Sequence, residues 1–169
     1  MPQVLDHPER ELVIVNDGTH DQRYSDVIAP FTGLVRYEAL PRSLGIAGAR
    51  NRSAELARGD YLVFTDDDCE VPLDWLDWLE ATLDTQPELD VVAGTALPLR
   101  PETAGLVGRV QVHYGLLPTP HDLGGLDQCY VTACLAVRSD MFRRLGGFGG
   151  RPLFSIAGED TDLSVRLIR

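Results

Sequence analysis

Apolar and polar positions alternate in blocks along the first half of the chain, and each block has the length of one strand or one helix. Short apolar runs rich in β-branched and aromatic residues predict strands. Amphipathic stretches that stop near Gly or Pro predict the helices between them. The predicted strands are 11–16, 34–40, 61–64 and 90–97, and the predicted helices are 22–31, 46–58 and 73–85. This order, β-α-β-α-β-α-β, predicts an α/β fold with a mainly parallel sheet covered by helices.

The pattern changes in the second half, where Gly and Pro interrupt the apolar blocks more often. We expect residues 115–128, which carry Gly, Pro and no periodic apolar spacing, to form a flexible loop. The other predicted elements are a helix at 102–114, a strand at 130–137, and helices at 139–145 and 158–169. Without repeats or a second core, residues 1–169 are predicted to form a single domain.

Three carboxylates, Asp66, Asp67 and Asp68, follow directly after the predicted strand 61–64. Carboxylates held together at the end of a buried strand repel one another and are costly to desolvate. A divalent cation relieves that cost, and hard oxygen ligands on a tight turn suit Mg²⁺ or Mn²⁺. The competing interpretation is an Asp-rich turn that caps a helix beginning at Pro72. Because open α/β sheets bind ligands at the carboxyl ends of their strands, the sequence favours the metal site.

Charge and cysteine content narrow the function and the compartment. The chain has 26 acidic and 15 basic residues in 169, a formal net charge of −11, which argues against nucleic-acid binding and against a basic membrane patch. No apolar run reaches the ~20 residues of a membrane span, and no signal peptide is visible. Cys69, Cys129 and Cys134 lack metal-type spacing, so we expect free thiols. The expected location is cytoplasmic, with a peripheral position at the inner membrane face left open.

Several motifs occur in a fixed order along the chain. They are Val13-Ile-Val-Asn-Asp-Gly-Thr-His-Asp21, Gly48-Ala-Arg-Asn51, Gly59-Asp-Tyr-Leu-Val-Phe-Thr-Asp-Asp-Asp68, Gly146-Gly-Phe148 and Gly158-Glu-Asp-Thr-Asp-Leu-Ser-Val-Arg-Leu167. In this order and at these separations they resemble the motifs of family 2 glycosyltransferases. The resemblance implies a GT-A fold, which is a Rossmann-like parallel sheet flanked by helices. It also implies transfer of a sugar from a nucleotide-diphosphate-sugar to an acceptor hydroxyl, with inversion at the anomeric carbon.

The resemblance also implies roles for the acidic turn and its metal. Asp68 matches the position that ligates Mn²⁺ or Mg²⁺, and Asp66 the position that contacts the donor ribose or the metal. Asp67 occupies the variable middle position, as a donor-side or merely solvated residue. Such a metal neutralises charge on the leaving diphosphate. His113 and His121 are weaker candidates for a further ligand.

Four more residues acquire expected roles in the same way. Asp160 matches the general base that takes the proton from the acceptor hydroxyl, and Glu159 is expected on the acceptor side. Asp17 matches the residue that pairs with a uracil-like base, which favours UDP- or dTDP-sugars; the alternative is an Asx-turn before Gly18. Arg50 is expected near the donor diphosphate. The acceptor is expected to be a saccharide, a lipid-linked molecule or another hydroxyl compound.

The chain departs from the family pattern at both ends. The usual first βα unit is missing before Glu11, and Arg169 falls inside an amphipathic run, so the chain resembles a catalytic core cut at both ends. The missing strand lies centrally in the family's sheet, and its loss predicts exposed strand edges and a homodimer. A second hypothesis is therefore a non-catalytic remnant that binds nucleotide-sugar or another chain. A third, a phosphatase of the haloacid dehalogenase type, is disfavoured because Glu70 stands where that motif needs Thr.

Overall fold

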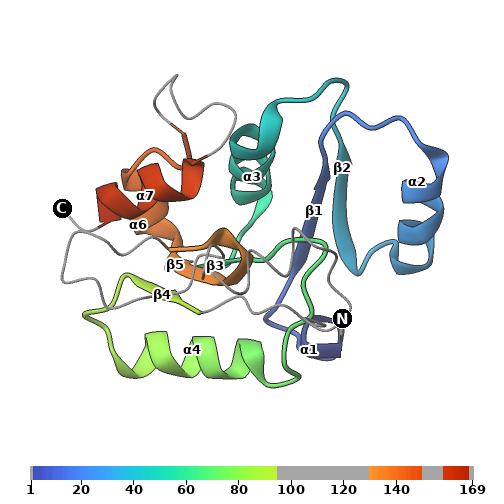
Figure 1. Cartoon of the computed structure of the whole chain (residues 1–169). Coiled ribbons are helices and arrows are strands. Elements are labelled where there is room, and N and C mark those ends of the chain that lie inside the picture. The colour runs from blue at the N-terminus through green and yellow to red at the C-terminus, as the bar shows by residue number, and fades with distance from the viewer. Residues whose placement is uncertain (1, 95–129, 150–157, 168–169) are drawn as a thin grey trace, which may run out of the picture.

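Figure 1 shows the computed structural model of the chain, in which residues 2–94, 130–149 and 158–167 are described. The strands are β1 (Leu12–Asn16), β2 (Val35–Ala39), β3 (Tyr61–Phe64), β4 (Val91–Ala93) and β5 (Leu135–Arg138). The α-helices are α1 (Pro2–Leu5), α2 (Gln22–Ile28), α3 (Gly45–Leu56), α4 (Trp75–Thr85), α6 (Ser139–Arg144) and α7 (Glu159–Leu167). Two 3-10 turns, η1 (Ala29–Phe31) and η3 (Thr132–Cys134), complete the described elements.

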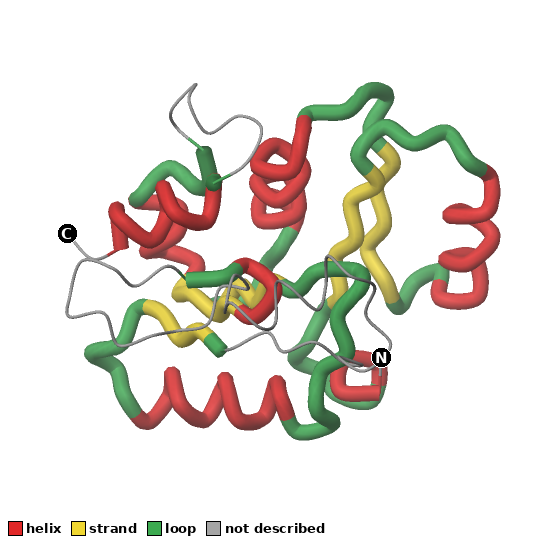
Figure 2. Tube along the Cα trace, in the orientation of Figure 1, coloured by secondary structure: helices red, strands yellow, loops and turns green. Residues whose placement is uncertain are grey.

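The strands form two separate sheets in the described part of the chain (Figure 2). In one, β1 and β2 pair in parallel, with Leu12 opposite Val35 and Asn16 opposite Ala39. In the other, the order is β3-β5-β4, and β5 runs antiparallel to both neighbours. The α/β class and the parallel β1–β2 pair agree with the sequence prediction. The antiparallel β5 was not predicted, because strand direction depends on how the chain returns to the sheet.

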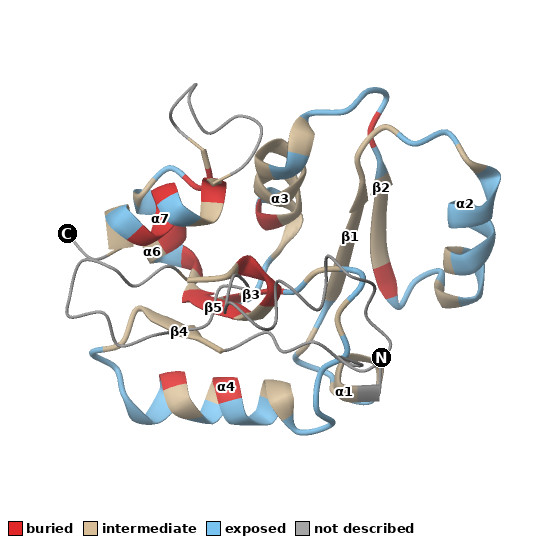
Figure 3. Ribbon diagram, in the orientation of Figure 1, coloured by how far each residue is buried: buried red, intermediate tan, exposed pale blue. Residues whose placement is uncertain are grey.

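Alternate side chains of the three-stranded sheet enter different cores, as the pleat of a strand requires. Leu62 and Phe64 of β3 pack with Leu135 and Val137 of β5 on one face. That face is covered by apolar residues of α3, α6, the turn after α6, and α7, namely Ala54, Phe142, Phe148 and Leu163. Phe64, Phe142 and Phe148 meet with ring centroids 5.0–5.5 Å apart. In Figure 3 this region contains most of the buried positions, whereas β1 is half-buried along its whole length.

The opposite face of the same sheet is covered by α4 (Figure 1). Leu79 and Leu83, one turn apart, pack on Ala136 of β5 and are almost fully buried. The sequence predicts that this helix begins at residue 73, and that start is two residues too early. The carbonyl of Pro72 accepts a hydrogen bond from the backbone N–H of Trp75 in a turn, and the helix begins at Trp75. Leu73 lies in this turn and is 81% exposed.

Two further boundaries differ from the sequence prediction. Residues 130–134 do not extend the strand, because a turn in which Cys134 donates to the carbonyl of Val131 precedes Leu135. At the other end, the unpredicted α1 leads to Arg10, which forms ion pairs with Asp77 and Glu80 of α4. The predicted helix 102–114, the loop 115–128 and the second half of strand 90–97 lie outside the described residues.

No helix among the described residues is both long and apolar enough to cross a membrane.

Candidate functional site

The acidic turn leaves the carboxyl end of β3 and lines a cleft. The backbone N–H of Cys69 donates to the carbonyl of Asp66 at 3.2 Å and closes the turn. Ligand atoms of Asp66, Asp68 and Cys69 lie within 4.8 Å of one another. The cleft, of about 380 Å³, is lined by Ile46 and Arg50 of α3, Thr65, and the three aspartates of the turn. Two carboxylates this close can share one hard divalent cation, so the residues present fit Mn²⁺ or Mg²⁺.

Cys69 is the member of this cluster that the sequence did not suggest. Burial, together with the carboxylates of Asp66 and Asp68, raises the pKa of the Cys69 thiol. The thiol is therefore neutral at pH 7, and its Sγ donates weakly to Asp68 Oδ1 at 3.9 Å. Because hard cations prefer oxygen to a protonated thiol, the two aspartates are the ligands that matter here.

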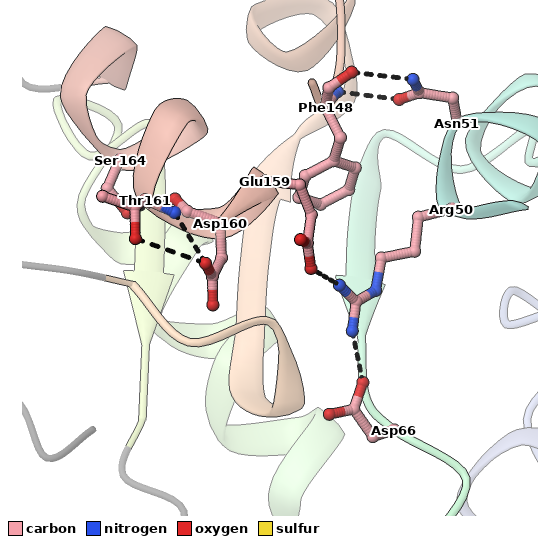
Figure 4. Close-up of polar contacts among 8 residues, drawn as sticks. All are labelled: Arg50, Asn51, Asp66, Phe148, Glu159, Asp160, Thr161 and Ser164. Carbon is pink, nitrogen blue, oxygen red and sulfur yellow. Dashed lines mark hydrogen bonds and ion pairs between the residues drawn. The ribbon is translucent and has the colours of Figure 1, made fainter. Parts of the chain in front are cut away.

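Arg50 connects the acidic turn to α7 (Figure 4). Its Nη2 donates to Oδ1 of Asp66 at 2.6 Å, and its Nη1 donates to Oε1 of Glu159 at 2.5 Å. The guanidinium also lies 5.9 Å from the centre of the Phe148 ring. The Glu159 side chain is 9% exposed and that of Arg50 19%, so this ion pair is largely withdrawn from solvent. The sequence predicted Arg50 and Glu159 as separate contacts to donor and acceptor, but the structure pairs them with each other.

The next residue on α3, Asn51, fastens the Gly-Gly-Phe turn to the same helix. Its Nδ2 donates to the Phe148 carbonyl at 3.0 Å, and its Oδ1 accepts from the Phe148 N–H at 2.8 Å. Gly146 and Gly147 have φ of +80° and +74°, a region that Gly enters without strain. Two motifs that are 97 residues apart in the chain are therefore one structural unit.

Asp160 occupies the first turn of α7 beside Glu159 (Figure 4). Its Oδ1 accepts from the backbone N–H of Thr161 at 2.7 Å. Further along the helix, the fully buried Ser164 donates from Oγ to the carbonyl of Asp160 and accepts from the N–H of Tyr130. These bonds fix the backbone that carries Asp160.

Two charged residues of the motif 158–167 anchor the part of α7 that follows Asp160. Asp162 is 5% exposed and pairs with Arg166 at 2.7 Å. Arg166 in turn donates to the carbonyls of Leu145 and Gly147, both at 2.7 Å. Asp162 and Arg166 are thus structural residues whose partners the sequence could not indicate.

Asp17 makes its contacts at the N-terminus of α3. Its carboxylate accepts from Ser43 Oγ at 2.6 Å and from the N–H groups of Leu44 and Gly45 at 2.6 and 3.0 Å. Partial burial opposes ionisation, but these hydrogen bonds together outweigh it and lower the pKa of Asp17. The side-chain contact that shapes this loop comes instead from Asn16, whose Oδ1 accepts from the N–H of Thr19, three residues later. Base recognition by Asp17 stays a prediction. His113 and His121 lie outside the described residues.

Comparisons with known proteins agree with this arrangement. A family model described as glycosyl transferase family 2 matches residues 2–145. A glucosyl-dolichyl phosphate glucuronosyltransferase of Haloferax volcanii is 33% identical over 90 residues, covering 52% of this chain and 28% of that protein. The chain thus spans under a third of the length of this curated relative.

Solved structures show the fold. That of S. aureus TarS 1-349 superposes with a TM-score of 0.71 at 16% identity, covering 98% of this chain and 48% of that one. The mannosyltransferase PcManGT of Pyrobaculum calidifontis, in complex with GDP-Man and Mn²⁺, has a TM-score of 0.59 at 23% identity, covering 85% and 40%. These likenesses confirm the GT-A glycosyltransferase fold. Given a family match over most of its length, the chain belongs to glycosyl transferase family 2.

Proposed function

We propose that this chain forms the donor-binding and catalytic core of an inverting, metal-dependent glycosyltransferase. It would transfer a sugar from a nucleotide-diphosphate-sugar to an acceptor hydroxyl. The observation that carries the proposal is the bridge through Arg50, which joins Asp66 on the acidic turn to Glu159, 109 residues away from Arg50. This bridge brings the candidate metal ligands and the turn that carries Asp160 to one side of α3.

Asp68 and Asp66 would hold Mn²⁺ or Mg²⁺, and Asp67, which is exposed on the same turn, would lie on the donor side of the cleft. The cation supplies neutralisation of the negative charge on the departing nucleoside diphosphate. Support comes from the PcManGT structure, which contains Mn²⁺ and GDP-Man. Arg50 lines the same cleft, and its guanidinium would contact the donor diphosphate after it releases Asp66.

Asp160 would act as the general base. Its Oδ1 is held by the Thr161 N–H, which leaves Oδ2 to accept a proton from the acceptor hydroxyl. As that proton moves, the acceptor oxygen bonds to the anomeric carbon, and the bond from this carbon to the diphosphate oxygen breaks. Attack from the face opposite the leaving group inverts the anomeric configuration. The buried Glu159 supports this turn through Arg50, and an acceptor contact by Glu159 stays a prediction.

A uridine or deoxythymidine diphosphate-sugar is the proposed donor. Asp17 could accept the imide N–H that these bases share, since carboxylate oxygens have more than one acceptor site. A structure of TarS in complex with UDP-GlcNAc also resembles this chain, with a TM-score of 0.64. For the acceptor, the name of the Haloferax relative favours a lipid-linked molecule over a free saccharide. Such an acceptor would suit a cytoplasmic protein working at the inner membrane face.

Calorimetry with a panel of nucleoside diphosphates tests this proposal. UDP should bind in the presence of Mn²⁺ and lose most of its affinity in EDTA, and Asp68→Ala should abolish that difference. Asp26→Ala, which removes an exposed carboxylate on α2, is the matched control and should bind as the wild type does. Equal UDP affinity with Mn²⁺ and with EDTA would contradict the metal role. Metal-dependent binding without release of nucleoside diphosphate would instead identify a non-catalytic binding protein.

We also propose that the chain self-associates through strand edges. In the described part, β1 pairs only with β2, and β3 only with β5, so each presents one unpaired edge. An apolar edge without a partner favours pairing with a second copy. Light scattering coupled to size-exclusion chromatography should show a dimer. A monomer with full transferase activity would show that the edges need no such partner.

A further inference from the structure

A positive charge from α3 lies against the acidic turn. Arg50 makes one hydrogen bond to Asp66 and another to Glu159, with donor–acceptor distances of 2.6 and 2.5 Å. Both of its partners are carboxylates, and one of them belongs to the proposed metal cluster of Asp66, Asp68 and Cys69. The guanidinium therefore stands at the edge of the site that is proposed to take a divalent cation.

Asp66 and Glu159 differ in how firmly they hold this guanidinium. The Glu159 side chain is 9% exposed, whereas that of Asp66 is 37% exposed. A buried carboxylate has little solvent to replace a lost partner, so releasing Arg50 from Glu159 costs more than releasing it from Asp66. Asp66 is therefore the partner that Arg50 can give up, with Glu159 as its anchor.

We propose that Arg50 is a built-in counter-cation that sets the metal affinity of the acidic turn. Without metal, Arg50 compensates part of the negative charge of Asp66. When a divalent cation is present, Arg50 gives up Asp66 and keeps Glu159. This inference rests on the metal site of the proposed function. It assigns Arg50 a role that is independent of sugar transfer, because it concerns the binding of the metal alone.

The sign of the effect separates this role from a purely structural one. Arg50 repels a cation that approaches Asp66, so its removal should strengthen metal binding. A residue that only held the turn in shape would do the opposite, since losing a group that orients a metal ligand weakens the affinity about 10–100-fold.

The experiment is titration of the chain with Mn²⁺ alone, followed by the electron paramagnetic resonance signal of free Mn²⁺. Arg50→Gln should bind Mn²⁺ about tenfold more tightly than the wild type, and Arg50→Lys should remain near the wild-type affinity. The matched control is Arg52→Gln, on the same helix, where Arg52 pairs with Glu38 and Glu55 and not with the turn. Its affinity should stay within about twofold of the wild type. Unchanged or weaker binding by a folded Arg50→Gln variant would overturn the inference.

Glu159→Gln provides the second arm, and its effect in the wild-type background can be measured even if Arg50→Gln does not fold. Without the charge of Glu159, Arg50 should stay on Asp66, so Mn²⁺ affinity should fall about tenfold. In the Arg50→Gln background the same substitution should have a clearly smaller effect, because the guanidinium that links the two sites is gone. An equal effect in both backgrounds, or no effect in the wild type, would refute the proposal that Arg50 releases Asp66 to the cation and stays with Glu159.

Asp68→Ala separates the two proposals. If the wild type does not bind Mn²⁺, or if Asp68→Ala binds it as well as the wild type, both the proposed metal site and the inference are wrong. When the wild type binds, Asp68→Ala does not, and Arg50→Gln fails to tighten binding, the inference alone is wrong.

Discussion

Gly147 lies so close to Asn51 that a Cβ atom on residue 147 would stand 2.5 Å from Asn51 Oδ1. This oxygen is the acceptor for the N–H of Phe148. Any side chain at 147 would therefore displace the amide that fastens the Gly-Gly-Phe turn to α3. The pair explains in physical terms why the Asn of one motif requires the Gly of another.

Gly147→Ala should destabilise the protein more than Gly146→Ala. Both residues have positive φ, and a Cβ in this region costs about 1–2 kcal/mol. A Cβ at 146 would meet nothing within 4 Å, so Gly146→Ala should cost only that strain. Gly147→Ala should lose about 1–2 kcal/mol more through its clash with Asn51. Urea unfolding of the two variants checks the difference, and equal losses would contradict the contact.

Asn51→Ala should lower the free energy of unfolding by about 2 kcal/mol, because two hydrogen bonds to Phe148 are lost at about 1 kcal/mol each. The matched control is Glu55→Ala, one turn later on α3, which removes an exposed ion pair with Arg52 and should cost below about 1 kcal/mol. Circular dichroism during urea unfolding measures both. If the two variants lost equal stability, the Asn51 amide would not be an important anchor.

Asp160→Asn should keep nucleotide binding and lose transfer. The amide retains Oδ1 for the Thr161 N–H, so the turn should be preserved. It cannot take a proton at neutral pH, and loss of a general base typically slows a reaction about 10²–10⁴-fold. Single-turnover transfer, measured beside UDP calorimetry, separates the two effects. Near wild-type turnover would show that another residue is the general base, and Glu159 would be the next residue to substitute.

Asp17 should make stability depend on pH. Because hydrogen bonds lower its pKa in the folded state, its contribution is present above the pKa of the unfolded chain and is lost as pH falls through the folded value. Asp17→Asn should therefore be about 1 kcal/mol less stable than the wild type at about pH 6. The difference should shrink as pH approaches about 3. Urea titrations at both pH values test this, and a gap that widens in acid would refute the capping role.

The elements that local patterns predicted correctly are those with local causes. β1 and β3 are uninterrupted apolar runs, and α3 stops close to Gly59, so periodicity and turn residues were sufficient. The acidic turn could also be predicted from the sequence, because all three aspartates are adjacent in the chain.

The interactions that the sequence did not reveal join distant parts of the chain. Neither the pairing of Arg50 with Glu159 nor that of Asn51 with Phe148 leaves a periodic trace, because each joins α3 to residues about 100 positions later. The start of β5 was missed for a different, local reason. Residues 130–134 look like strand residues, but the N–H of Cys134 donates to the carbonyl of Val131 and forms a 3-10 turn before Leu135.

The position of β5 has a consequence for how the chain folds as it is synthesised. β5 is the middle strand of its sheet but the last of the three in sequence. In the described part of the chain β3 and β4 both pair with β5, so they emerge from the ribosome before their partner strand. The β1–α3–β2 region, whose contacts span short stretches of chain, can form first. Until residue 138 is made, β3 and β4 remain apolar segments with open edges, which is the interval in which a nascent chain is most prone to aggregation.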